Sequence, residues 1–296
     1  MKEIQLKAYG KINLGLDVLR KREDGYHDLS MIMQTVGVYD DIIISETDSS
    51  GEITVETDTA VLSSGKDNLA YMAAKILLDE FRIHHGINIH INKRIPIAGG
   101  MAGGSADCAA VLKGINEMFA LGLDKKALME RGVKLGADVP YCVLGGTALA
   151  EGIGDRLTPI EMPPKCHVII AKPPISVSTA YVYGHIKPEK ITRRPDIKGI
   201  IKAIEERDLQ KMSFLLYNVM EEVTVGEYPI IQNIKETILQ AGALNSIMSG
   251  SGPTVFGIFD DIKKAENAEK ALIEKGLTEQ LYICLLYTSP SPRDGA

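Results

Sequence analysis

The fold is decided by residues 96–106, which read Pro96-Ile97-Ala98-Gly99-Gly100-Met101-Ala102-Gly103-Gly104-Ser105-Ala106. Four of the six residues from Gly99 to Gly104 are glycines. Glycine costs conformational entropy on folding, so a dense cluster marks a forced backbone conformation or a close approach of the backbone to another group. Few side chains therefore stand between this backbone and whatever lies against it.

The residues on either side predict that this glycine loop joins a strand to a helix. Residues 87–91 alternate between apolar and polar side chains as a strand does, and apolar side chains recur near helical spacing from Ala106 to Phe119. A glycine loop that leads into a helix points free N–H groups and the positive end of the helix dipole at one place, which suits a phosphate. A tight packing turn is the alternative, but the density of glycines favours anion binding.

The loop differs from the common nucleotide-binding motifs. The sequence G-x-x-x-x-G-K-[ST] requires a lysine after its last glycine, whereas Ser105 directly follows Gly104. The dinucleotide fingerprint G-x-G-x-x-G does not fit the loop, and the protein-kinase signatures H-R-D and D-F-G are missing. We therefore expect a phosphate loop of another kind.

Four further motifs accompany the glycine loop: Ala8-Tyr9-Gly10-Lys11-Ile12-Asn13-Leu14-Gly15-Leu16, Asp24-Gly25-Tyr26-His27, Leu135-Gly136-Ala137-Asp138-Val139-Pro140 and Met248-Ser249-Gly250-Ser251-Gly252-Pro253. In this order, the motifs resemble those of the GHMP kinases, the small-molecule kinases named for galactose, homoserine, mevalonate and phosphomevalonate. The resemblance extends from about Lys7 to about Phe259. The family loop usually reads G-G-S-S-D, but Ala106 replaces its second serine, so any hydroxyl contact from that position to phosphate or metal is missing.

The resemblance implies an α+β, two-domain GHMP kinase fold. Its N-terminal half would resemble domain 2 of ribosomal protein S5, and its C-terminal half would be ferredoxin-like. We expect an N-terminal domain with the ATP phosphate loop at residues 1–158 and a C-terminal domain at residues 159–283, because prolines punctuate the middle of the chain. Residues 284–296 read like a translated sequencing-library adapter, which predicts a non-native tail without function; the alternative is a short disordered tail.

The motif at residues 24–27 narrows the implied activity. It resembles that of the family member that uses ATP to phosphorylate the 2-hydroxyl of 4-diphosphocytidyl-2-C-methyl-D-erythritol, in the non-mevalonate isoprenoid precursor pathway. Two alternatives stay open: another GHMP kinase such as homoserine kinase, and a non-catalytic nucleotide-binding protein. Mg²⁺ should accompany ATP, because it bridges the phosphates. No acidic pair in the sequence identifies the Mg²⁺ ligands. The hydroxyl of Ser105, in the glycine loop, would reach the ion directly or through water.

Two residues are candidates for the chemical step. Phosphoryl transfer is mostly positioning and charge stabilisation, with a base that accepts the hydroxyl proton. The resemblance implies that Asp138 is this base; the alternative is a cap on a short helix. Lys11 is the candidate partner and shares one face of a half-buried strand with Asn13, although a solvated surface lysine is the alternative. An ammonium near Asp138 would keep the carboxylate ionised and stabilise charge on the attacking oxygen.

Four residues are candidates for binding the cytidylyl substrate: Asn13, Tyr26, His27 and Tyr183. The resemblance implies that His27 forms hydrogen bonds with the cytosine edge, while Tyr26 supports a stacking face and Tyr183 supplies the other stacking position. From the residues alone, a solvent-exposed loop position for His27 and a core position for Tyr183 remain open.

Composition limits the class of protein. The chain has 296 residues, a formal net charge of −6, 45% hydrophobic and 24% charged residues, which is typical of a soluble globular protein. The negative balance argues against a broad nucleic-acid surface, and no apolar run approaches the ~20 residues of a membrane span. The four cysteines form no C-x-x-C pair. We expect a cytoplasmic enzyme with a small-molecule substrate and no obligate protein partner.

Overall fold

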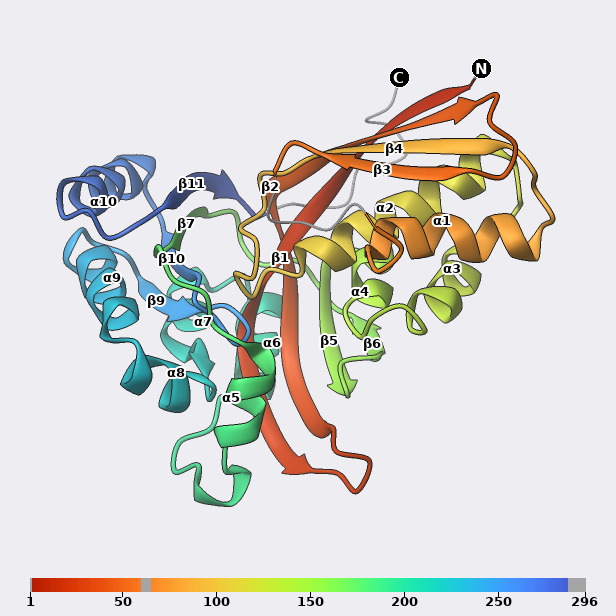
Figure 1. Ribbon diagram of the computed structural model, residues 1–296. Coiled ribbons are helices and arrows are strands. Elements are labelled where there is room, and N and C mark those ends of the chain that lie inside the picture. The colour runs from red at the N-terminus through yellow and green to blue at the C-terminus, as the bar shows by residue number, and fades with distance from the viewer. Residues whose placement is uncertain (1, 60–64, 287–296) are drawn as a thin grey trace. The chain divides into compact units, whose positions relative to one another are not determined.

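The computed structural model describes residues 2–59 and 65–286, and its mixture of helices and strands confirms the α+β class (Figure 1). The chain forms two compact units, and each draws on three stretches of sequence. The first comprises Met1–Gly10, Val38–Ile95 and Ala102–Leu144, and the second comprises Lys11–Gly37, Pro96–Met101 and Gly145–Ala296. The long strands β1 (Glu3–Lys21) and β2 (His27–Thr47) therefore contribute to both units. The boundary expected after residue 158 stays a prediction.

The first unit is a sheet with helices packed on it (Figure 1). Its strand order is β3-β4-β2-β1, with β3 at Ile53–Thr57 and β4 at Gly86–Asn92. The helices are α1 (Leu69–Glu80), α2 (Gly103–Met118), α3 (Lys125–Gly132) and α4 (Val139–Leu144). Asn68 caps α1 and Asp124 caps α3 through their side chains, as their positions in the sequence predict.

The second unit contains a four-stranded antiparallel sheet in the order β11-β7-β10-β9. Its strands are β7 (His167–Lys172), β9 (Asn245–Met248), β10 (Val255–Phe259) and β11 (Gln280–Leu285). Helices α9 (Pro229–Gln240) and α10 (Ile262–Glu274) cover one face of it (Figure 1). The first strand, β7, and the last, β11, lie side by side, and helices connect β7 to β9 and β10 to β11. This is the ferredoxin-like arrangement that the resemblance implies.

The remainder of the second unit is built on β1 and β2. Strand β5 (Thr147–Gly152) pairs with β2, β6 (Arg156–Pro159) pairs with β5, and β8 (Tyr217–Asn218) pairs in parallel with β1. The segment between β7 and β9 also holds α5 (Thr179–His185), the 3₁₀ helix η1 (Pro188–Lys190), α6 (Ile197–Glu205), α7 (Leu209–Leu215) and α8 (Glu221–Glu227). The sequence predicts a helix over residues 209–219, but α7 ends at Leu215, because Tyr217 and Asn218 form β8.

Strand β1 differs from the half-buried strand that the sequence predicts. It is buried on both faces along most of its length, polar residues included. Helix α6 covers the strand at Gly15, where an added Cβ would lie 2.9 Å from the side chains of Ile197 and Ile200, while Lys11 contacts Gly100 and Asn13 contacts Met31. The face that carries Lys11 and Asn13 is thus covered by protein in the second unit.

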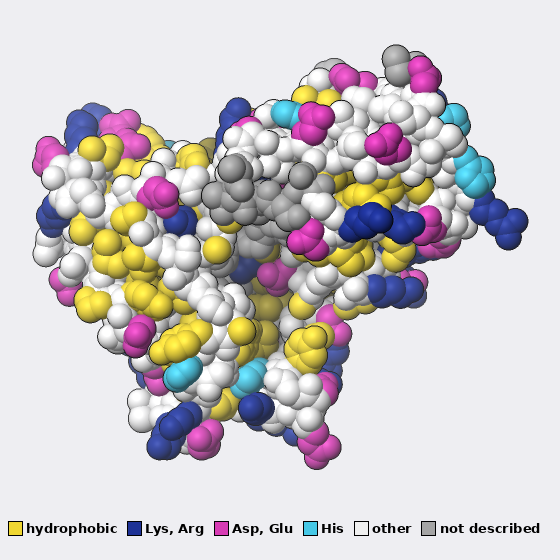
Figure 2. All heavy atoms as spheres, in the orientation of Figure 1, with side chains coloured by type: hydrophobic (Ala, Val, Ile, Leu, Met, Phe, Trp, Pro, Cys, Tyr) yellow, Lys and Arg dark blue, Asp and Glu magenta, His cyan; other side chains and the backbone are white. Residues whose placement is uncertain are grey.

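The C-terminal strand reaches into the sequence expected to be a non-native tail. Cys284 and Leu285 belong to β11 and pair with Val168 and His167 of β7, and Leu286 forms a bridge with Val36. Residues 287–296 lie outside the described residues. No helix in the described ranges is long and apolar enough to cross a membrane. On the face drawn in Figure 2, Lys and Arg side chains are interspersed with Asp and Glu side chains.

Candidate active site

The first part of the glycine loop, residues 96–101, belongs to the second unit and packs closely against the backbone of that unit. The backbone N–H of Lys11 donates to the carbonyl oxygen of Met101 over 3.1 Å. Gly100 has a φ of 74°, and a Cβ there would overlap the carbonyl oxygen of Ser249. A Cβ on Gly99 would lie 2.6 Å from Oγ1 of Thr254. Packing therefore accounts for these two glycines, which is the alternative that the sequence left open.

The second part of the loop opens helix α2 and leaves N–H groups without protein acceptors. Ala102 precedes the helix in the left-handed conformation and supplies no side-chain cap. The first helical hydrogen bond runs from Ala106 N to Ala102 O, so the N–H groups of Gly103, Gly104 and Ser105 have no acceptor among the residues that the structure describes. These donors and the positive end of the helix dipole offer the chemistry that an anion requires, and phosphate binding by the loop stays a prediction.

Three buried charged side chains, Lys93, Asp40 and Asp107, form a cluster beside the two ends of the glycine loop in the first unit. The Lys93 ammonium donates to Asp40 and, over 2.7 Å, to Asp107. Asp40 also accepts from the backbone N–H of Ile95 over 2.8 Å. Lys93 and Ile95 precede the loop and Asp107 follows it, so this charge cluster ties the two ends of the loop together. The Lys93 Nζ lies 3.4 Å from the position that a Cβ on Gly103 would take, which places a cation beside the start of α2.

Burial changes the proton affinities in this cluster. It raises the pKa of Asp107 to about 7, although the Lys93 charge opposes the rise. Burial alone would lower the pKa of Lys93, but the charges of Asp107 and Asp40 outweigh it and raise that pKa. Asp107 Oδ1 is buried and has no hydrogen-bond partner within the described part of the chain. The lysine thus stays charged at neutral pH, while the Asp107 carboxyl is close to its point of titration.

Lys11 is buried, which excludes the solvated surface position that the sequence left open. The residue is 5% exposed. Its Nζ donates to Asn13 Oδ1 over 2.8 Å and to the Gly100 carbonyl oxygen over 2.9 Å. Asn13 is fully buried, and its Nδ2 lies 3.3 Å from Met31 Sδ. Strand β1 therefore brings the candidate lysine and asparagine together and joins them to the glycine loop.

Asp138 directly precedes helix α4 in the first unit. Its backbone carbonyl oxygen accepts from Cys142 N over 3.1 Å, as an N-terminal helix residue does. The side chain is half-buried, and its carboxylate has no hydrogen-bond or ion-pair partner among the described residues of its unit. The predicted short helix is present, but the carboxylate does not cap it. Lys11 belongs to the other unit, and the expected pairing of the two side chains stays a prediction.

His27 and Tyr183 lie together in the second unit, although they are far apart in the sequence. Their ring centroids are 5.2 Å apart with an interplanar angle of 30°. His27 is the first residue of β2 and is only 6% exposed, so it is not the exposed loop histidine that the sequence left open. Burial, helped by the charge of Lys21, lowers the pKa of His27, so the imidazole is neutral at pH 7 and offers one donor and one acceptor. Tyr26 precedes it and is 59% exposed.

Sequence reasoning missed several polar residues around the loops. These are Asp40 and Asp107 of the charge cluster, and Asn218, whose amide donates to the carbonyl oxygen of Met248. The available signal was an acidic or amide side chain within an otherwise apolar stretch. No group of three or more His, Cys, Asp or Glu side chains that could hold a metal ion occurs in residues 2–59 and 65–286.

Two family models match parts of this chain. The family model described as the N-terminal domain of GHMP kinases matches residues 68–146, and the one described as the C-terminal domain matches residues 200–277. The chain therefore belongs to the GHMP kinase family.

Relatives within the family cover nearly the whole chain. A protein of Lachnoclostridium phytofermentans named 4-diphosphocytidyl-2-C-methyl-D-erythritol kinase is 52% identical over 90% of this chain and 91% of its own. One of the same name from Lachnospira eligens is 46% identical over 97% of this chain and 100% of its own. A crystal structure of 4-(cytidine 5'-diphospho)-2C-methyl-D-erythritol kinase shares 28% identity and a TM-score of 0.82, over 97% of this chain and 100% of that one.

Proposed function

We propose that this chain is an ATP-dependent kinase that transfers a phosphoryl group to the 2-hydroxyl of 4-diphosphocytidyl-2-C-methyl-D-erythritol, giving the 2-phosphate and ADP. Relatives named for this activity match along almost the full chain. The observation that supports this choice of substrate is the buried, neutral His27 beside the Tyr183 ring. A hydrogen-bonding edge next to an aromatic face is what recognition of a single unstacked base requires.

The described residues divide the chemical work. The free N–H groups at the start of α2 and the Lys93 ammonium would hold the ATP phosphates. The Asp138 carboxylate, without a partner in its unit, would accept the hydroxyl proton, and the Lys11 ammonium would stabilise charge on the attacking oxygen. Asn13 would hold the Lys11 ammonium beside the substrate.

Magnesium would enter with ATP. Protein sites for Mg²⁺ in kinases use few protein oxygens plus the substrate phosphates, which fits a chain whose described residues lack an acidic metal cluster. The Ser105 hydroxyl, at the start of α2, is the side chain we propose as a ligand, and Ala106 offers none. When bound, the ion supplies charge neutralisation at the phosphates.

A coupled ADP-release assay tests the function. The purified chain is given ATP, Mg²⁺ and, in turn, the cytidylyl substrate, homoserine and mevalonate. We expect ADP release with the cytidylyl substrate only. Release with homoserine would assign the chain to another activity of the family, and ATP binding without release on any substrate would make it a non-catalytic binder.

A further inference from the structure

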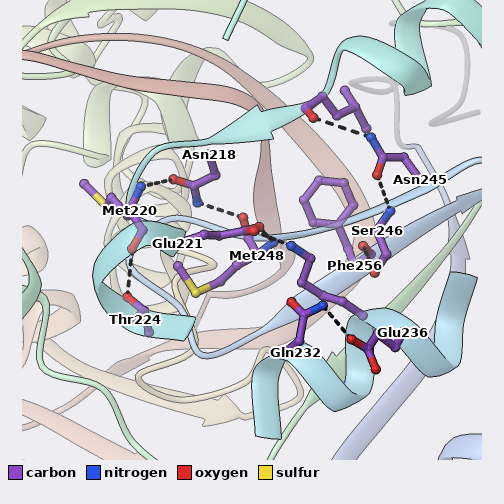
Figure 3. Close-up of polar contacts among 12 residues, drawn as sticks. Asn218, Met220, Glu221, Thr224, Gln232, Glu236, Asn245, Ser246, Met248 and Phe256 are labelled. Atoms are coloured by element: carbon purple, nitrogen blue, oxygen red, sulfur yellow. Dashed lines mark hydrogen bonds and ion pairs between the residues drawn. The ribbon is translucent and has the colours of Figure 1, made fainter. Parts of the chain in front are cut away.

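Asn218 is a fully buried amide whose donors and acceptor all have partners, of which Figure 3 shows Met220 and Met248. Its Nδ2 donates to the carbonyl oxygens of Met248 and Gly250, each over 2.8 Å. Its Oδ1 accepts from the backbone N–H of Met220 over 2.9 Å. The two carbonyl groups flank Ser249, so one side chain fixes the start of the second glycine loop, residues 249–252.

Glu221 holds the same place from the other side. Its Oε1 accepts from the backbone N–H of Met248 over 2.6 Å, and its other oxygen forms an ion pair with Lys235. Met248, the last residue of β9, is thus held at its N–H by Glu221 and at its carbonyl by Asn218 (Figure 3). The backbone that enters the second glycine loop has little freedom to move.

The second glycine loop in turn fixes Gly100 and Lys11. The Ser249 hydroxyl donates to the Gly100 carbonyl oxygen over 3.0 Å, and Lys11 Nζ donates to the same oxygen over 2.9 Å. These two donors match the two lone pairs of a carbonyl oxygen. A Cβ on Gly250 would lie 2.9 Å from the Gly100 carbonyl oxygen and 3.4 Å from Lys11 Nζ, so no side chain fits between the loop and these two groups.

We infer that Asn218 is a positioning residue for the Lys11 ammonium, acting through residues 249–252 and the Gly100 carbonyl oxygen. The inference rests on the proposed kinase activity and on the role of Lys11 in it. Every contact in this path lies within the second unit. Misplacement of a reacting group by about 1 Å can cost on the order of 10²-fold in rate, so a residue that touches no substrate can still govern kcat.

The chemistry of the path requires an amide at position 218. Asn218→Asp keeps the size of the side chain but replaces the two donated hydrogens with a carboxylate that faces two carbonyl oxygens. Asn218→Ala removes the side chain and leaves both carbonyl groups without that donor. Both variants should loosen residues 249–252, and we expect kcat to fall about 10-fold or more with each, with a smaller change in KM for ATP.

Asn245 provides a matched control at the opposite end of β9 (Figure 3). Its amide donates to the carbonyl oxygen of Ser213 over 2.6 Å, and its Oδ1 accepts from Ser246 N over 2.8 Å. Asn245→Ala therefore removes part-buried hydrogen bonds of the same kind without touching the second glycine loop. The melting temperature should fall in both alanine variants, whereas kcat should fall only in Asn218→Ala. A fall in kcat of equal size in both would overturn the inference.

Lys11→Met supplies the decisive background. If Asn218 acts through Lys11, Asn218→Ala should cost little further kcat in the Lys11→Met enzyme, because the group that it positions is gone. An equal cost in both backgrounds would mean that Asn218 does not act through Lys11. Where the Asn218 variants fail to fold, Ser249→Ala takes their place, since it removes only the hydroxyl that meets Gly100; it should lower kcat in the wild-type background alone.

Failure of the inference and failure of the proposed function are distinguishable. A wild-type chain that releases no ADP with the cytidylyl substrate refutes the function. A wild-type chain that is active, together with an impaired Lys11→Met variant and unimpaired Asn218 and Ser249 variants, refutes the positioning role alone.

Discussion

Lys11, which we propose acts in the chemical step, is held in place before any substrate arrives. Lysine is rarely buried unless it has partners. Lys11 is only 5% exposed, and its ammonium donates to Asn13 and to Gly100. Two hydrogen bonds to neutral oxygens help to fix the position of the ammonium. A preorganised cation of this kind costs no reorganisation when negative charge develops, which is the usual source of electrostatic catalysis.

Asp138 gives the first prediction at the residue scale. Asp138→Asn keeps the size of the side chain and removes the proton acceptor. General-base catalysis typically contributes ~10²–10⁴-fold, and kcat should fall by about that factor while ATP affinity changes little. Steady-state kinetics with an ATP titration of the folded variant checks this. Wild-type kcat in Asp138→Asn would leave the residue as nothing more than the start of α4.

His27 gives the second. His27→Ala removes one hydrogen-bonding edge that we assign to the cytidylyl substrate. A hydrogen bond between neutral groups contributes ~0.5–1.5 kcal/mol, which corresponds to about 2- to 13-fold in affinity. KM for the cytidylyl substrate should therefore rise by about that factor and KM for ATP should not. Equal changes in both KM values would contradict the assignment.

Residues carried by short motifs could be predicted from the sequence, whereas those joined by distant segments could not. The glycine loop, His27 and Lys11 lie in such motifs. Asp40 meets the loop only because antiparallel pairing places Asp41 of β2 opposite Asn92 of β4, and a register cannot be read from either strand alone. Asn218 likewise depends on the pairing of β8 with β1.

The glycine loop gives the prediction at the scale of one element. Gly100→Ala introduces a Cβ where the Ser249 carbonyl oxygen already lies, at a backbone φ of 74°. The variant should lose stability by more than ~1 kcal/mol and should bind ATP more weakly, because the loop must move. Gly51→Ala is the matched control: Gly51 has a φ of 71° but nothing within 4 Å of its added Cβ. Differential scanning calorimetry and ATP titration of both variants test the claim, and equal losses would mean that backbone strain alone is responsible.

Elements with a clear local period were predicted well, and elements defined by pairing were not. Strand β4 and helix α2 follow from alternation and helical spacing around the loop. The end of α7 and the whole of β8 were missed, because Tyr217 and Asn218 pair with Gly15 and Leu16 far away in the chain. Tertiary pairing overrides local helical propensity at such places.

The C-terminus gives the prediction at the scale of the molecule. A chain ending at Leu286 keeps β11 and the bridge to Val36, so its melting temperature and activity should equal those of the full chain. A chain ending at Ile283 loses two pairs of β11 with β7 and the contact of Cys284 with Gly37. Its melting temperature should fall by about 2–4 °C for each kcal/mol lost. Thermal unfolding of both truncations decides the matter, and an unchanged Ile283 truncation would make Cys284–Leu286 dispensable.

The buried cluster of Lys93, Asp40 and Asp107 makes the stability of the protein a function of proton concentration. Burial raises the pKa of Asp107 from 3.8 to about 7, so between these pH values the folded chain holds a proton that the unfolded chain has released. The free energy of unfolding should therefore decline as pH rises through this window, and the decline should end above it. Urea denaturation at a series of pH values should show a shallower decline in Asp107→Asn, which has no proton to lose, while Asp79→Asn on the exposed face of α1 should follow the wild-type curve. Between these pH values, folding of the chain is thus coupled to the uptake of a proton at Asp107.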